Sequence, residues 1–270
     1  MMLQLSGELK KWWAGKDVFT EVQQLSGQVV RDKEGRQTKR VEIDGKVYYR
    51  KLHTGVGWWE ILKNLLQGRL PIIGASNEWL AINRLHRLGV DTLTPVAYGS
   101  RGVNPATRLS FLMSEELTDT ISLARFSESW PENPPPFALK KALIEKVAEI
   151  TRTIHRDGIN HRDLYICHFL LDVSRGEESL RPDNIRLFLV DLHRAQMRSQ
   201  VPLRWLVKDL GSIDYSSLKI GLTSRDRLRF LRVYFQRPLR EILASERSLL
   251  RRVEGRTAKL YQREVRKGLV

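Results

Sequence analysis

The stretch that decides how this sequence folds is residues 160–171, which read NHRDLYICHFLL. A helix is predicted directly before it, over residues 137–157, because apolar residues fall on one helical face at Leu143, Val147, Ile150 and Ile154. Two predicted strands follow, at residues 169–173 and 185–190, and Asp191 comes directly after the second strand. The centre of the chain is therefore a long helix, a polar loop and a pair of strands that ends in an aspartate.

The segments upstream of this centre favour strands. Short strands are predicted at residues 27–31, 38–43, 46–52, 94–99 and 109–113. The dipeptide Asp44-Gly45 predicts a hairpin turn, and Ser76 is the expected N-cap of a helix over residues 77–88. Pro134–Pro136 follows this strand-rich part, and a helical part continues from residue 201, so we take the prolines as a candidate boundary.

Composition and charge narrow the class of protein. The 270 residues are 41% hydrophobic, enough for a sizeable core, and the net charge of +15 predicts an anionic partner. The single cysteine, Cys167, excludes a disulfide framework and a cysteine-rich zinc site. Residues 1–16 lack the apolar run of a secretory signal, and no stretch is apolar for long enough to span a bilayer. We therefore expect a cytoplasmic protein, with contact to a membrane surface still open.

The order of the segments indicates phosphate transfer. His161-Arg162-Asp163 after a helix, followed by strands that end at Asp191, is the order of the catalytic and metal-binding segments in kinase-fold enzymes. Upstream, Lys51 ends a predicted strand where such enzymes place the lysine that contacts the nucleotide phosphates. Glu78 on the next predicted helix is expected to pair with Lys51, with Glu60 as the competing carboxylate; the alternative is a solvated lysine and an ordinary first-turn acid.

This order also predicts the architecture. We expect an α+β, two-lobed, protein-kinase-like fold. A small, mainly β N-terminal lobe is expected at residues 1–117, and a larger, mainly α C-terminal lobe at residues 118–270.

Several motifs resemble those of one enzyme family. They are Gly15-Lys16-Asp17, Lys63-Asn64-Leu65-Leu66, Gly89-Val90-Asp91-Thr92, Asn160 to Leu171, Asp191 to Gln196 and Gly221-Leu222-Thr223. Through them the chain resembles, nearly end to end, the lipopolysaccharide core heptose kinases of Gram-negative bacteria, and the match to the heptose(I) kinases is close. The resemblance implies transfer of the ATP γ-phosphate, with Mg²⁺, to the 4-hydroxyl of the first heptose of the lipopolysaccharide inner core.

The resemblance also implies roles for individual residues. Asp163 falls at the catalytic aspartate, Lys51 at the nucleotide lysine and Asp191 at the magnesium aspartate. Asp209 resembles the buried helix aspartate that braces the catalytic loop. The adenine is expected to meet the backbone of the segment that joins the lobes, with Glu115 and Leu117 as the expected ATP contacts. His161 and Arg162 are expected to support the catalytic loop.

The sequence departs from the general kinase pattern at two places. His168 stands five residues after Asp163, where protein kinases use asparagine for a second magnesium. It is expected to ligate the metal, to bind a phosphate or to orient Asp163, and neutral imidazole is a poorer magnesium ligand than oxygen. The expected phosphate-covering loop, near Ser26-Gly27-Gln28, has a single glycine, which favours phosphate binding by side chains.

Two rival functions explain part of the pattern. A protein kinase, acting on tyrosine or on serine and threonine, would use the same residues. Only 18 positions separate Asp191 from Asp209, however, and no Ala-Pro-Glu lies between them, which leaves little room for a peptide platform. A nucleic-acid-binding protein would explain the positive charge but not the catalytic segments, so we expect no nucleic-acid partner.

The positive charge is concentrated near the C-terminus. Residues 223–270 hold 14 Lys and Arg against 5 Asp and Glu. Candidates for contact with the anionic acceptor are Arg225, Arg227, Arg229 and Arg232, although a solvated helix face is the commoner explanation. The charge also suits an acidic protein partner, and it suits the anionic inner membrane, where the family acts.

An aromatic and aliphatic stretch adds a further candidate surface. Residues 58–66 include Trp58 and Trp59 with Lys63 nearby, as an interfacial helix would. We expect core packing for this stretch and keep membrane contact as the alternative.

Overall fold

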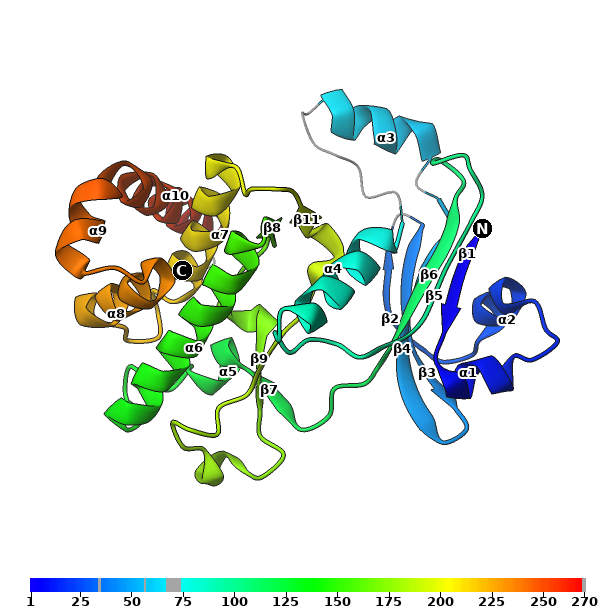
Figure 1. The fold of residues 1–270 in the computed structure, drawn as a ribbon, viewed down its shortest axis with the longest axis horizontal. Helices are drawn as coiled ribbons and strands as arrows, with labels where there is room; N and C mark the ends of the chain where they lie inside the picture. The colour runs from blue at the N-terminus through cyan, green and yellow to red at the C-terminus, as the bar shows by residue number, and fades with distance from the viewer. Residues whose placement is uncertain (34, 56, 67–73, 269–270) are drawn as a thin grey trace. The chain divides into compact units, whose positions relative to one another are not determined.

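The computed structural model describes residues 1–33, 35–55, 57–66 and 74–268. The chain forms two compact units (Figure 1). The first unit comprises residues 1–84, 93–117 and 192–194, and the second comprises residues 85–92, 118–191 and 195–270. The first is built on a mainly antiparallel sheet and the second is mainly helical, so the α+β class is confirmed. The division into functional lobes at residue 117 stays a prediction.

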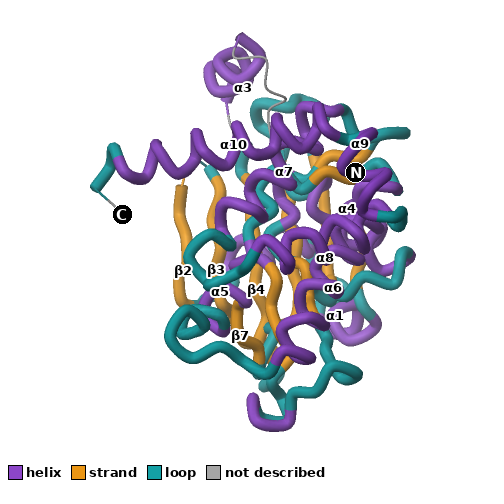
Figure 2. The backbone as a smooth tube through the Cα atoms, turned by 90° about the vertical axis from the view of Figure 1, so that its left-hand side faces the viewer, coloured by secondary structure: helices purple, strands orange, loops and turns teal. Residues whose placement is uncertain are grey.

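An antiparallel sheet forms the first unit, with the strand order β1-β5-β6-β4-β3-β2. Its strands are β1 (Met2–Leu5), β2 (Gln28–Lys33), β3 (Arg36–Ile43), β4 (Lys46–His53), β5 (Pro95–Arg101) and β6 (Leu109–Glu115). The predicted hairpin joins β3 to β4, where Asp44 and Gly45 have φ angles of 51° and 72° and Ile43 pairs with Lys46. Figure 2 shows β2, β3 and β4 side by side.

Four helices accompany this sheet within the described residues. They are α1 (Gly7–Trp12), α2 (Val18–Gln24), α3 (Gly57–Leu66) and α4 (Ser76–Arg87). Residues Leu9 and Phe19 of α1 and α2 pack with strand residues such as Val41 and Phe111 in one buried cluster. On α4, Ile82 and Leu85 are fully buried. The sequence predicted α4 but missed α1 and α2, which supply much of the core.

The second unit consists of helices and short strands. Its helices are α5 (Leu123–Phe126), α6 (Phe137–Arg156), α7 (Leu203–Ser216), α8 (Ser224–Phe235), α9 (Leu239–Ser245) and α10 (Arg247–Val265). Its strands are β7 (Thr120–Ser122), β8 (Ile159–Asn160), β9 (Phe169–Asp172), β10 (Leu187–Leu189) and β11 (Gln196–Met197). Leu210, Tyr234 and Leu249, from three different helices, share a buried cluster with Ala148 of α6.

The long helix α6 agrees with the prediction, and its end explains a glycine. Gly158 has a φ of +77°, and a Cβ atom there would lie 1.8 Å from the carbonyl oxygen of Arg198. Only glycine fits that position, so the chain can turn directly into β8. Pro134–Pro136, in contrast, is not a boundary. Pro136 is the N-cap of α6, and the prolines lie inside the second unit.

The expectation that residues 58–66 pack in the core holds for Ile61 and is wrong for Trp58, Trp59, Leu62 and Leu66. In α3 only Ile61 is buried, at 5% exposure, among the described apolar side chains, whereas Trp58 and Trp59 are 55% and 79% exposed. In the described part of the chain, every helix is too short or too polar to cross a membrane.

Candidate active site

A buried aspartate on α7 holds the polar loop that follows α6. One Asp209 carboxylate oxygen accepts a hydrogen bond from the His161 backbone N–H at 2.7 Å, and the other accepts one from the Arg162 N–H at 2.8 Å. Asp209 is fully buried, and the ring of His155 lies 3.4 Å behind it. Charged acceptors of two backbone donors make strong hydrogen bonds. The bracing that the resemblance implied for Asp209 therefore has a geometric basis.

Replacing Asp209 with asparagine should lower the free energy of unfolding. The amide keeps one acceptor oxygen but turns an NH₂ group toward a buried backbone N–H, so we expect a loss of about 2–3 kcal/mol. Asp214, on the same helix, offers a matched control. It pairs with Arg227 at 3.3 Å and accepts a hydrogen bond from the Thr257 hydroxyl at 2.8 Å. Asparagine keeps an acceptor oxygen for that hydroxyl, so Asp214→Asn should lose about 1 kcal/mol or less. Urea unfolding of both variants measures the difference, and equal losses would contradict the bracing role.

Asp163 lies in the braced loop, beside a lysine. The Lys208 ammonium donates a hydrogen bond to the Asp163 carboxylate at 3.3 Å. Lys208 is adjacent to Asp209 on α7, so the helix that braces the loop also delivers a cation to Asp163. Arg162 adopts a φ of +75°, and its guanidinium lies over the Trp205 ring at 4.9 Å. Sequence reasoning missed Lys208, whose only signal was its position next to Asp209.

Asp191 lies close to His168, beyond the end of β10. The two side chains approach to 3.5 Å, from His168 Nε2 to Asp191 Oδ2. The other ring nitrogen of His168 lies 2.7 Å from the Asp163 backbone carbonyl oxygen. His168 thus connects the loop of Asp163 to Asp191, which itself adopts a left-handed φ of +63°.

The protonation of His168 bears on its expected metal role. Burial lowers its pKa, but the Cys167 side chain, the Asp163 carbonyl and the Asp191 carboxylate outweigh burial and raise the pKa to about 9. A protonated imidazole has no lone pair for a metal. The Asp191 carboxylate, one-third exposed, is an oxygen donor of the type that Mg²⁺ prefers. Asp191 therefore fits magnesium, and the ligand role of His168 stays a prediction.

His161 is a buried structural link. Its Nε2 atom lies 2.9 Å from the Val190 carbonyl oxygen, next to Asp191, and its ring stacks on His168 with the centroids 5.7 Å apart. Burial lowers its pKa, so the ring is neutral and donates to Val190 from Nε2. His161 therefore ties the catalytic loop to the strand that leads to Asp191.

The first unit holds the expected nucleotide lysine. Lys51 on β4 forms an ion pair with Glu78 on α4, and the Glu78 side chain is 2% exposed. The pair fixes a long side chain that would otherwise sample many rotamers. The side chain of the competing Glu60 lies outside the described residues.

The expected adenine and phosphate segments also belong to the first unit. Glu115 ends β6 and donates its N–H to the Thr94 carbonyl, and Leu117 follows two residues later. Ser26-Gly27-Gln28 is not the connection between β2 and β3, because Gln28 begins β2. The turn between those strands contains Gly35, where a Cβ atom would lie 2.4 Å from the Gly55 carbonyl oxygen. The position of a phosphate-covering loop stays a prediction.

The expected acceptor arginines lie on α8, in the second unit. Arg229 pairs with Asp226 at 2.6 Å, and Arg227 pairs with Asp214. Arg225 and Arg232 are exposed on the same helix. Two of the four guanidinium groups thus have acidic partners within the unit, and the acceptor role of all four stays a prediction.

The fold and these residues define a kinase-like phosphotransferase, and comparisons with known proteins agree. A family model described as the lipopolysaccharide kinase (Kdo/WaaP) family matches residues 20–234. The lipopolysaccharide core heptose(I) kinase WaaP of Pseudomonas aeruginosa is 52% identical over 268 residues, which cover 99% of each chain. WaaP of Escherichia coli is 47% identical over 269 residues, 99% of this chain and all of that protein.

A solved structure, "WaaP in complex with acyl carrier protein", is also similar, with a TM-score of 0.84 and 48% identity over 97% of this chain and 100% of that one. The chain belongs to the lipopolysaccharide kinase (Kdo/WaaP) family. This membership supports a kinase that acts on a sugar hydroxyl, and it does not support the protein-kinase or nucleic-acid-binding alternatives.

Proposed function

We propose that this protein transfers the γ-phosphate of ATP to the 4-hydroxyl of the first heptose of the lipopolysaccharide inner core. The observation that carries the proposal is Asp163, held in a loop that Asp209 braces and accompanied by Lys208 at 3.3 Å. The identity to heptose(I) kinases over nearly the whole chain supports the choice of acceptor.

Asp163 orients the acceptor hydroxyl for in-line attack. Its carboxylate accepts a hydrogen bond from the sugar hydroxyl and takes the proton late, because phosphoryl transfer has a loose transition state. The Lys208 ammonium, hydrogen-bonded to this carboxylate, adds positive charge where phosphate oxygens gather. The rigid loop matters because a small displacement of Asp163 would misalign the hydroxyl.

Each unit has candidate nucleotide contacts of its own. In the first unit, Lys51 binds the α- and β-phosphates, and the backbone near Glu115 and Leu117 receives the adenine. In the second unit, Asp191 would hold Mg²⁺, which would neutralise negative charge on the phosphates. Glu78 keeps Lys51 in position, as the ion pair between them indicates.

Phosphate transfer from γ-labelled ATP tests the function. The acceptor is lipopolysaccharide that lacks heptose phosphate, and casein and RNA serve as competing targets. We expect label in the lipopolysaccharide alone. Label in casein would favour a protein kinase, and salt-sensitive RNA binding without any label would favour the nucleic-acid alternative.

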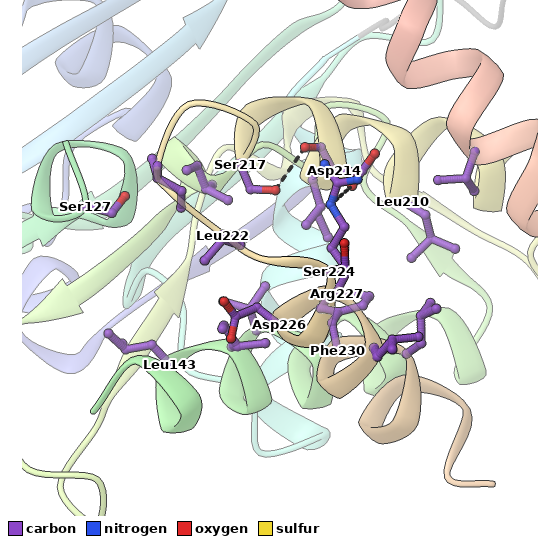
Figure 3. A pocket seen from close by; sticks show the side chains of 18 of the residues that line it. Ser127, Leu143, Leu210, Asp214, Ser217, Leu222, Ser224, Asp226, Arg227 and Phe230 are labelled. Atoms are coloured by element: carbon purple, nitrogen blue, oxygen red, sulfur yellow. Dashed lines mark hydrogen bonds and ion pairs between the residues drawn. The ribbon is translucent and has the colours of Figure 1, made fainter. Parts of the chain in front are cut away.

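We also propose that the protein binds an acyl carrier protein whose acyl chain enters an apolar pocket of the second unit. The pocket has a volume of about 390 Å³. Figure 3 shows Leu143, Leu210, Leu222 and Phe230 around it. A pocket of this size lined mostly by aliphatic side chains suits an alkyl chain. The excess of basic residues after residue 222 favours an acidic partner.

Filling this pocket should abolish capture of the acylated carrier. Leu228 and Leu231 of α8 line the pocket, and Leu228→Trp with Leu231→Trp would occupy the space of the chain. Leu203, 44% exposed and not part of the lining, provides the control Leu203→Trp. We expect the double variant to bind acyl carrier protein loaded with a palmitoyl chain about tenfold more weakly than wild type does. The control should bind it as wild type does. Unchanged binding by the double variant would contradict the pocket assignment.

The acceptor is part of a glycolipid, so we place the protein on the cytoplasmic face of the inner membrane. Phosphates and carboxylates of the acceptor core would meet the exposed Arg225 and Arg232 of α8. Arg227 and Arg229, with their acidic partners, would orient these contacts.

A further inference from the structure

Helix α3 presents its apolar side to solvent. Four apolar side chains of this helix are at least half exposed: Trp58 at 55%, Trp59 at 79%, Leu62 at 50% and Leu66 at 88%. A helix on the surface of a globular protein normally turns such side chains toward the core. Large exposed apolar patches of this kind mark contact surfaces.

Helical geometry gathers these side chains on one side. With 3.6 residues per turn, Trp58, Leu62, Leu66 and Trp59 fall within an arc of about 100°. Ile61, about 60° outside this arc, is 5% exposed. Lys63 borders the arc. We call the four exposed side chains the α3 face.

A second apolar and basic segment adjoins α3. The Gly57 N–H, at the start of the helix, donates to the Ala106 carbonyl at 3.0 Å in the loop between β5 and β6. At the tip of that loop Val103 is 93% exposed, and Arg108 donates to the carbonyls of Gly102 and Val103. Residues 99–109 contain two arginines and no acidic residue, and Arg101 is paired with Asp17. Figures 1 and 2 show α3 standing clear of the sheet of its unit.

We infer that the α3 face binds the surface of an anionic lipid bilayer. Tryptophan and leucine beside basic residues are typical of helices that lie in the membrane interface. The net charge of +15 favours an anionic surface. The inference rests on the proposed function, in which the acceptor is carried by a membrane. The pocket proposed above for the acyl chain of a carrier protein lies in the second unit and shares no lining residue with this face.

Vesicle flotation tests the inference. The full chain, in complex with acyl carrier protein, is mixed with vesicles of phosphatidylethanolamine and phosphatidylglycerol at about 3:1. The test variant is Trp58→Ser with Trp59→Ser. The control is Trp12→Ser, which removes a tryptophan that is 46% exposed on α1. We expect wild type and the control to float with the vesicles. The vesicle-bound fraction of the double variant should be about tenfold lower than that of wild type.

Other outcomes would overturn the inference. Flotation of the double variant at the wild-type level would do so, as would failure of wild type to float. If flotation is unchanged and the double variant no longer self-associates, the face binds a second copy of the chain. If flotation is unchanged and the double variant no longer binds acyl carrier protein, the face binds the carrier. Transfer to soluble, deacylated core oligosaccharide separates the two proposals. The double variant should transfer phosphate to this soluble acceptor as well as wild type does. If wild type itself transfers no phosphate to it, the proposed function is rejected and the flotation result still stands.

Discussion

Replacing Asp163 with asparagine is expected to lower kcat for phosphate transfer by about 10³-fold, because the amide cannot accept the proton of the sugar hydroxyl. The KM for ATP should change little, since Asp163 acts on the acceptor. The loop should stay folded, because its two backbone bonds end on Asp209. Single-turnover transfer at saturating ATP measures the effect.

The matched control for this variant is Glu149→Gln, which neutralises an exposed carboxylate on α6. It should keep nearly wild-type turnover. Asp163→Asn with near-normal turnover and an unchanged unfolding transition would remove Asp163 from the reaction. A loss of turnover that follows a loss of folding would instead assign it a structural role.

Replacing Asp191 with asparagine is expected to lower kcat/KM for MgATP by about 10³-fold, because a neutral amide is a much weaker magnesium ligand than a carboxylate. Raising the magnesium concentration should recover part of the activity. Asp191 also pairs with His168, so the variant removes one of the contacts that connect the loop of Asp163 to the end of β10.

Asp172 provides the control for this second variant. It lies at the other end of the same strand pair and accepts a hydrogen bond from the Ser174 N–H at 2.9 Å. Asp172→Asn should stay within about twofold of wild type, since an exposed loop contact contributes little. Equal losses in the two variants, or a loss in Asp191→Asn that is independent of magnesium, would contradict the metal role.

The parts of the site that could be predicted are those encoded locally. Asp163 lies in the His161-Arg162-Asp163 tripeptide after helix α6, and Asp191 follows strand β10, so the tripeptide and the order of the elements pointed to both residues. The Lys51 and Glu78 pair followed from a strand end and one helical face. These assignments needed only the order of elements along the chain.

Contacts between distant segments were not predictable in the same way. Lys208 meets Asp163 across 45 positions, and no local pattern distinguishes it from other helix lysines. The helices α1 and α2 are short, and their apolar residues form a core only with β3 and β6. The exposed side of α3 was read wrongly because an apolar stretch does not reveal whether its partner is the core or another surface.

The position of the phosphate on the product tests the account most directly. Lipopolysaccharide without heptose phosphate is incubated with ATP, Mg²⁺ and the protein, and the isolated core is analysed by phosphorus–proton correlation NMR. We predict one new phosphomonoester at position 4 of the first heptose with wild type and none with Asp163→Asn. A phosphate on another sugar, or the same product from the Asp163→Asn variant, would contradict the account.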